Sequence, residues 1–192
     1  MATIYLHNRF RFGNDDGGTE GNYTFSAAEN AGLTIAEDST TRLLRIHLTT
    51  VGSSANITAG VSWQWQYKLN AGSWTNITTT SSVIKAVDAS SFTNADETAI
   101  RLTTDGTGGI SPNDGCTEDG TSGTGGDFAK AKDCETVLAF QIVTADVVPG
   151  DVVSMMAYNA SITSYDATPT ITFSSGATII PIIMANNRRR RT

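Results

Sequence analysis

Large apolar and polar residues alternate strictly from residue 61 to residue 69, and this stretch constrains the fold more than any other in the chain. Successive side chains of a β-strand point to opposite faces, so the alternation predicts a strand with one apolar and one polar face. The apolar positions are Val61, Trp63, Trp65, Tyr67 and Leu69, and the polar positions are Ser62, Gln64, Gln66 and Lys68. A face this bulky has to be covered, normally by a second sheet about 10 Å away.

A turn and a returning strand follow this stretch. Residues 70–72 are Asn-Ala-Gly, and Gly72 can adopt the positive φ that a tight hairpin turn needs. Further segments with strand character lie at residues 41–48, 136–143, 152–160 and 169–175. The sequence therefore predicts an all-β chain that forms a single antiparallel β-sandwich, of immunoglobulin-like or jelly-roll-like type.

We expect one domain with extended ends and a long loop, because 192 residues are few for two domains. Residues 1–20 predict an N-terminal arm or an edge strand, and residues 21–175 predict the sandwich. Within it, residues 105–135 form a Gly-rich insertion with seven acids against two lysines. An insertion of that length is expected either to move or to pack on a partner. Residues 176–192 predict a C-terminal arm that is first apolar and then rich in arginine.

The charge of the chain argues against nucleic acid as a direct partner. The formal net charge is −6, and without the four arginines at 188–191 it would be −10, whereas phosphate binding needs a basic surface. The arginine run has three interpretations: contact with nucleic acid, docking on an acidic neighbour, or a solvated tail. We favour docking on another copy or on a partner.

No segment of the sequence predicts membrane insertion or export. No stretch of 18 apolar residues suggests a membrane-spanning helix, and the opening residues lack an apolar run of signal-peptide length. We therefore expect assembly in a cytoplasm.

Enzymatic activity is not expected. The chain has two histidines, His7 and His47, both on predicted strands, and it has no Gly-x-Ser-x-Gly motif. Carboxylates cluster only in the long loop, whereas acid–base catalysis needs rigidly placed groups. We predict no catalytic residue, no cofactor and no firmly defined metal site.

Two features of the long loop leave alternatives open. Asp114, Glu118 and Asp119 are a weak calcium candidate, because their spacing does not match an EF-hand loop and a solvated acidic loop explains them as well. Cys116 and Cys134 bracket the Gly-rich segment and could form a disulfide at its base, or remain two unpaired thiols.

The three tryptophans bear on function. Trp63 and Trp65 share a stripe with Val61 and Leu69, so we expect both rings in the core. Trp74 follows the turn and could be exposed, which makes it the candidate contact for a glycan.

Several motifs together resemble those of uncharacterised virion structural proteins of tailed bacteriophages, which look like immunoglobulin-like β-sandwiches. The resemblance rests on "WQYKLNAGSWTNI", "SSVIKAVDASSFTNADETAIRLT", "FQIVTADVVPGDVV" and "TPTIT", and it covers about residues 40–172. The chain departs from the pattern at Ala71, where the group often has glycine, and the arginine-rich end is not part of the pattern.

The resemblance implies a non-enzymatic virion structural protein, which we expect to decorate or stabilise a capsid surface after assembly in the host cytoplasm. Expected partners are other copies of the chain and a major capsid or tail protein. The residues expected to make these contacts are Ile4, Leu6, Phe10, Phe12, Ile182, Ile183, Arg188, Arg189, Arg190 and Arg191. The alternatives are a carbohydrate-binding or adhesin module that contacts a host glycan, and a tail-tube or fibre subunit.

Overall fold

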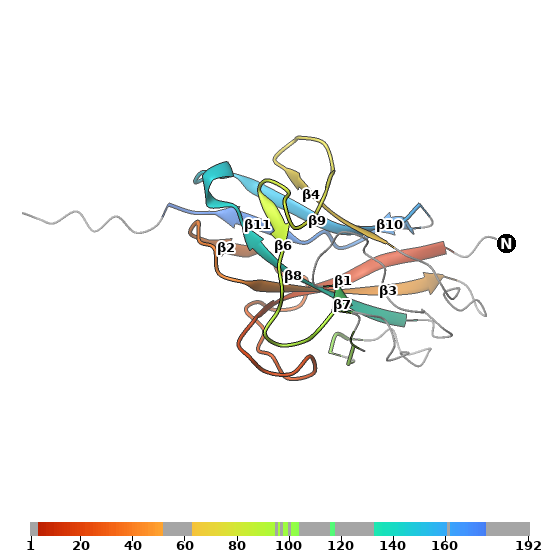
Figure 1. Cartoon of the computed structure of the whole chain (residues 1–192). Coiled ribbons are helices and arrows are strands. Elements are labelled where there is room, and N and C mark those ends of the chain that lie inside the picture. Colours follow the sequence, from red (N-terminus) through yellow and green to blue (C-terminus); the bar gives the residue numbers. More distant parts are fainter. Residues whose placement is uncertain are drawn as a thin grey trace, which may run out of the picture.

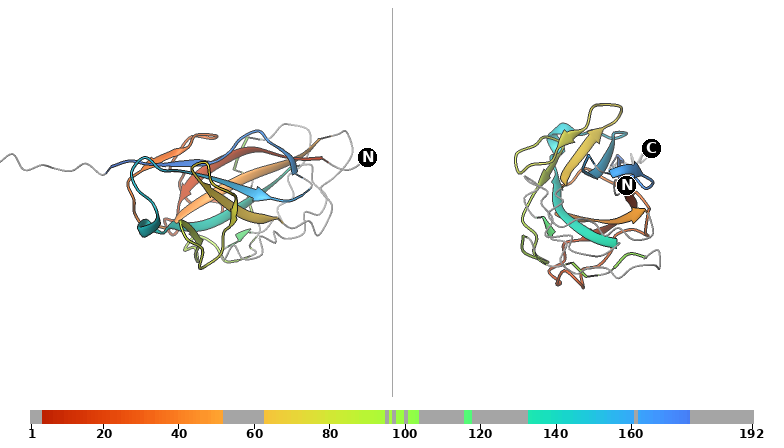
Figure 2. Two further views of the ribbon diagram at one scale, coloured as in Figure 1. Left: turned by 90° about the horizontal axis from the view of Figure 1, so that it is seen from above. Right: turned by 90° about the vertical axis from the view of Figure 1, so that its right-hand side faces the viewer.

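Two β-sheets face one another across a shared apolar interior (Figures 1 and 2). The computed structural model describes residues 4–51, 63–94, 96, 98–99, 101–103, 116–117, 133–160 and 162–175. Among these residues there is no α-helix and one 3-10 turn, η1 (Thr144–Asp146). No described helix is therefore long and apolar enough to span a membrane.

Each sheet draws strands from distant parts of the chain. Sheet A has the order β10 (Ile162–Tyr165), β1 (Ile4–Asn14), β3 (Arg42–Val51), β8 (Asp133–Ile142) and β6 (Ile84–Ala86), and β7 (Cys116–Thr117) also pairs with β8. Sheet B has the order β2 (Leu33–Ile35), β11 (Thr170–Phe173), β9 (Val152–Tyr158), β4 (Gln64–Leu69) and β5 (Thr75–Asn76).

The all-β prediction is confirmed, and two facing sheets agree with a sandwich. The pairing is mixed, however, and not purely antiparallel. β1 pairs with β10, β2 with β11, and β7 with β8 in parallel, while the other strand pairs are antiparallel. Parallel neighbours need a long connection, so these three pairs join segments that lie far apart in the sequence or are linked by a loop.

The interior confirms the interpretation of the alternating stripe. Trp63, Trp65 and Tyr67 are buried among residues from both sheets, with Trp65 fully inaccessible. Residues that share this interior from the other strands are Phe10, Phe12, Leu44, Ile46, Leu138, Phe140, Val153, Met155, Ile171 and Phe173. The stripe is therefore architectural.

The position of β1 corrects the prediction of an N-terminal arm or edge strand. β1 lies between β10 and β3 and is hydrogen-bonded to both. Phe10 and Phe12 are buried in the chain's own core, so they are not available to a neighbouring subunit. The backbone of Ile4 and Leu6 pairs with β3, and their side chains lie outside the described residues.

A β-bulge changes which face of β1 carries His7. His7 pairs with Leu48 and Arg9 pairs with His47, which leaves Asn8 as the extra residue. A bulge of one residue shifts the alternation by one. His7 therefore shares the inner face with Leu48 and contacts the ring of Tyr165, with ring centroids 5.7 Å apart, whereas regular alternation from the buried Phe10 and Phe12 would place it on the opposite face.

We predict that burial of His7 makes the fold sensitive to mild acid. Burial lowers the pKa of His7 from its ordinary value of 6.5 to about 3; the Ala167 backbone and Asp166 oppose this shift, and His47 adds to it. Because the fold favours the neutral ring, the stabilisation is complete above about pH 6.5 and is lost as the pH falls toward 3. The free energy of unfolding should fall by up to about 1.4 kcal/mol per pH unit from this group.

Urea unfolding at a series of pH values measures this slope. The variant His7→Leu should lack it between about pH 6.5 and pH 5, above the range in which most carboxylates titrate. Equal slopes for the parent and the variant would contradict the assignment.

Candidate functional site

The outer face of sheet A is covered by a layer of irregular chain. This loop layer consists of residues 15–30 and the described residues of 87–103, and it lies below β1, β3 and β8 in Figure 1. Between the layer and the sheet is a second, smaller core made of Tyr23, Leu43, Phe92, Val137 and Ala139. Sheet A is therefore buried on both faces where the layer covers it.

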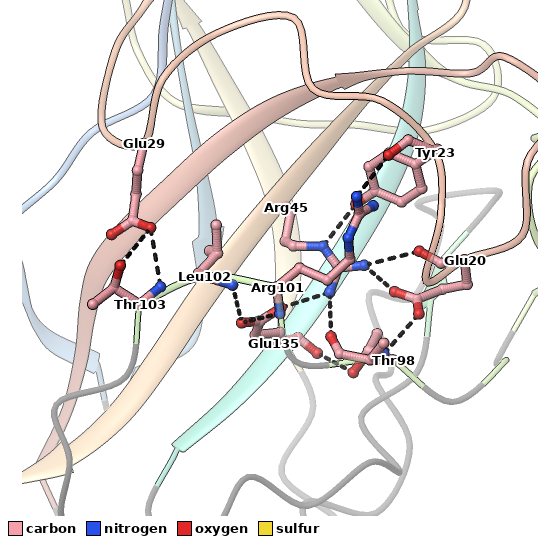
Figure 3. A network of polar contacts seen from close by, with 10 residues as sticks. Glu20, Tyr23, Glu29, Arg45, Thr98, Arg101, Leu102, Thr103 and Glu135 are labelled. Carbon is pink, nitrogen blue, oxygen red and sulfur yellow. Dashed lines mark hydrogen bonds and ion pairs between the residues drawn. The ribbon is translucent and has the colours of Figure 1, made fainter.

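An ionic cluster at the centre of this interface is the candidate site (Figure 3). Arg45, on β3, has no exposed surface, and its guanidinium is fully engaged. It donates to Glu135 Oε2 at 2.6 Å, to Tyr23 Oη at 2.7 Å and to the Ala99 carbonyl at 2.8 Å, and it also pairs with Glu20 Oε1. A buried cation needs such a complete set of partners, since an unpaired one costs several kcal/mol.

The carboxylates of the cluster also hold the backbone of the loop layer. Glu135 accepts hydrogen bonds from the backbone N–H groups of Arg101, at 3.1 Å, and Leu102, at 2.8 Å. Glu20 Oε2 accepts the Ala99 N–H at 2.6 Å. The described part of residues 88–102 forms no strand, and carboxylates take the place of a neighbouring strand as acceptors.

Two further acids fasten the layer at its ends. Asp15 accepts hydrogen bonds from the backbone N–H and the hydroxyl groups of both Ser90 and Ser91, at 2.8–3.0 Å. Glu29 accepts from the Thr103 N–H at 3.0 Å and pairs with Arg9 at 3.2 Å. Acidic side chains therefore bind the loop layer along its length.

Arginine and aromatic side chains alternate in a stack beside the cluster. Arg11 lies 4.0 Å from the Phe25 ring centroid, Arg101 lies 4.3 Å from those of both Phe25 and Tyr23, and Arg45 lies 5.4 Å from that of Tyr23. Such cation–π contacts contribute about 0.5–2 kcal/mol each, more when they are desolvated. The stack joins β1 and β3 to both segments of the loop layer.

The electrostatics of the cluster fix its protonation state. Burial by itself would lower the pKa of Arg45, but Tyr23, Glu135 and Glu20 raise it above its ordinary value. Burial also raises the pKa of Tyr23, so its hydroxyl stays protonated. Arg45 and Tyr23 therefore each keep one protonation state at ordinary pH values, which makes these two groups unsuited to proton transfer.

An open depression next to the cluster offers no free carboxylate. Its lining residues are Thr19, Glu20, Gly21, Ser91, Asp96, Thr98 and Ala99. Glu20 is held by Arg45 and Ala99, and Asp96 accepts from the Thr93 N–H at 2.6 Å and the Thr93 hydroxyl at 2.7 Å. In the described part of the chain, no three His, Cys, Asp or Glu side chains lie close enough together to hold a metal ion.

Some of the predicted site residues lie outside the residues that the structure describes. Asp114, Glu118 and Asp119 of the calcium candidate lie outside it, as do Ile182, Ile183 and Arg188–Arg191. The backbone of Cys116 pairs opposite Val137 and that of Cys134 opposite Leu48, but the side chains are not described, so the disulfide stays a prediction. Trp74 is 37% exposed.

The sequence alone did not identify Arg45 and Glu135 as site residues. Both stand at alternate positions of strands, where a charged residue ordinarily marks a solvated face. The available signal was the apolar run at residues 137–140 in β8, which is typical of a strand buried on both faces. A charged residue on a strand next to such a run needs a buried partner.

Comparison of the chain with protein-family models, with curated proteins and with solved structures finds no match.

We predict that Glu135→Gln destabilises the fold by about 3 kcal/mol or more, because it leaves the Arg45 guanidinium buried with half of its countercharge removed. The matched control is Asp38→Asn. Asp38 pairs with Arg42 at 2.9 Å but is 40% exposed, so this variant should cost at most about 1 kcal/mol. Urea unfolding of the two variants compares these losses, and equal losses would contradict a buried ionic cluster.

Gly13 provides an independent test of the stack. A Cβ at Gly13 would lie 2.6 Å from the Tyr23 ring, so Gly13→Ala should displace Tyr23 and cost about 1–3 kcal/mol, with a changed near-ultraviolet circular dichroism spectrum. At Gly21, a Cβ would meet only the Ala99 Cβ at 3.5 Å, an ordinary contact. Gly21→Ala should therefore behave like the parent, and a similar loss in both variants would contradict the prediction.

Proposed function

We propose that the chain is a non-enzymatic structural protein of a tailed-phage particle that decorates or stabilises the capsid surface. The observation that carries the proposal is the ionic cluster beneath the loop layer. Its charged groups all serve to fix the chain's own loops, as a durable building block requires. A catalytic site would need at least one titratable group that is free to react.

The strands at the edges of both sheets are poorly suited to pairing with the sheets of another subunit. They favour subunit contacts through the C-terminal residues instead. The described edge strands β10, β6, β7, β2 and β5 contain two to four residues each. Short edges offer few unpaired backbone groups to another chain, so strand addition to the body is disfavoured. Because Phe10 and Phe12 lie in the core, the proposed contacts are Ile4, Leu6, Ile182, Ile183 and Arg188–Arg191.

The tail-tube or fibre alternative uses the same contacts and differs only in location on the particle. The exposure of Trp74 separately supports the carbohydrate-binding alternative.

We predict that replacing Arg188, Arg189, Arg190 and Arg191 together by glutamine prevents assembly and leaves folding intact. In a chain with nineteen acids, the arginines are the natural group to pair with an acidic surface of another subunit. Light scattering on a sizing column, with negative-stain images of the same peak, should show a defined oligomer for the parent and a monomer for the variant. The double variant Arg42→Gln, Lys85→Gln is the control for lost positive charge on the body. An unchanged oligomer in the quadruple variant would contradict this role.

A further inference from the structure

The outer face of sheet B has a chemistry that differs from that of the rest of the chain. The side chains that alternate with the buried stripe of β4 are Gln64, Gln66 and Lys68, and they point away from the core. None of the five strands of sheet B carries an acidic residue, although the chain has nineteen. This face is therefore nearly uncharged on a strongly acidic protein.

Two large aromatic side chains are exposed on this face. Trp74 is 37% exposed and Tyr158 is 42% exposed. Lys68 Nζ lies 5.0 Å from the centroid of the Trp74 ring, which holds the ring on the β5 side of β4. Tyr158 stands opposite Gln64, on the β9 side of β4. Of the large apolar side chains in the described residues, only Val148 is also exposed, and it lies in the turn that precedes β9.

Amide groups occupy the space between the two rings. The register pairs Gln66 with Asn76, and the Gln66 amide donates to Asn76 Oδ1 at 2.8 Å. Asn76 is exposed and Gln66 is half-exposed, so solvent reaches this pair. Trp74 and Tyr158 are separated by four residues along β4 and by two strand spacings across the sheet. Their backbones are therefore roughly 16 Å apart.

We propose that the outer face of sheet B binds a neutral polysaccharide chain that lies across β5, β4 and β9. Sugar rings present apolar C–H faces, which pack on aromatic rings, and hydroxyl groups, which hydrogen-bond to amides. The separation of Trp74 and Tyr158 suits an extended oligosaccharide and exceeds what one sugar ring spans. On the described strands of sheet B, an anionic polymer would meet one cation, Lys68, and a protein partner would find little contiguous apolar surface.

Affinity electrophoresis in native gels tests the proposal with dextran, galactomannan and hydroxyethyl cellulose as neutral probes, and polygalacturonate as the anionic one. At least one neutral polymer should retard the full-length chain, and polygalacturonate should not. Trp74→Ala and Tyr158→Ala should each weaken the retardation about tenfold or more. Val148→Ala, which removes a more exposed apolar group in the turn before β9, should match the parent. Because Trp74 and Tyr158 are exposed, both variants should keep the parent's circular dichroism spectrum.

Three results would overturn the proposal: no retardation by any of the neutral polymers, retardation that survives both aromatic substitutions, or equal retardation by polygalacturonate. The occupant of this face could instead be a second copy of the chain. Light scattering tests this, because a dimer that Trp74→Ala abolishes would also overturn the proposal. The assay uses the isolated chain, so its outcome is independent of whether the chain belongs to a virus particle.

Discussion

The buried guanidinium of Arg45 is the constraint on which the structure of the sheet A side depends. A charge with no access to water has to be surrounded by partners, and here those partners come from the loop layer and from β8. Because Glu20 and Glu135 use their remaining oxygens on backbone N–H groups, the same carboxylates that neutralise Arg45 also hold the backbone of Ala99, Arg101 and Leu102. The same set of bonds thus neutralises one cation and orders a segment without regular secondary structure.

The two sheets use polar residues in opposite ways. On the sheet A side, Asp15 and Glu29 of the loop layer hold other loop residues by hydrogen bonds, so the acidic composition of the chain is partly a structural requirement. On sheet B, the outward positions of β4 are amides and one lysine, and they leave aromatic rings accessible. One face is closed by the chain itself, and the other is presented to solvent. This division agrees with the proposal that the outer face of sheet B is a recognition surface.

Period-two alternation was sufficient to predict the all-β class, the β4 hairpin and the burial of Trp63 and Trp65. It failed where one residue changes the period, because the bulge at Asn8 brings His7 to the inner face. It also failed for β1, since a strand's neighbours depend on long-range pairing that no local pattern contains. The ionic cluster could not be predicted because Arg45 and Glu135 look like solvated strand residues until the loop layer is placed over them. The sequence indicated that Trp74 could be exposed, but it did not predict that Tyr158 is exposed as well.

The wide separation of paired residues in the sequence determines when the protein can fold during its synthesis. Arg45 precedes its partner Glu135 by 90 residues, and β1 pairs with β10, whose residues follow it by more than a hundred positions. At usual rates of translation, the ribosome needs on the order of ten seconds to make the segment between Arg45 and Glu135. During that interval Arg45 has Glu20 but lacks Glu135, and sheet A lacks β8 and β10. The complete ionic cluster and the complete sheet A can therefore form only late in translation or after release.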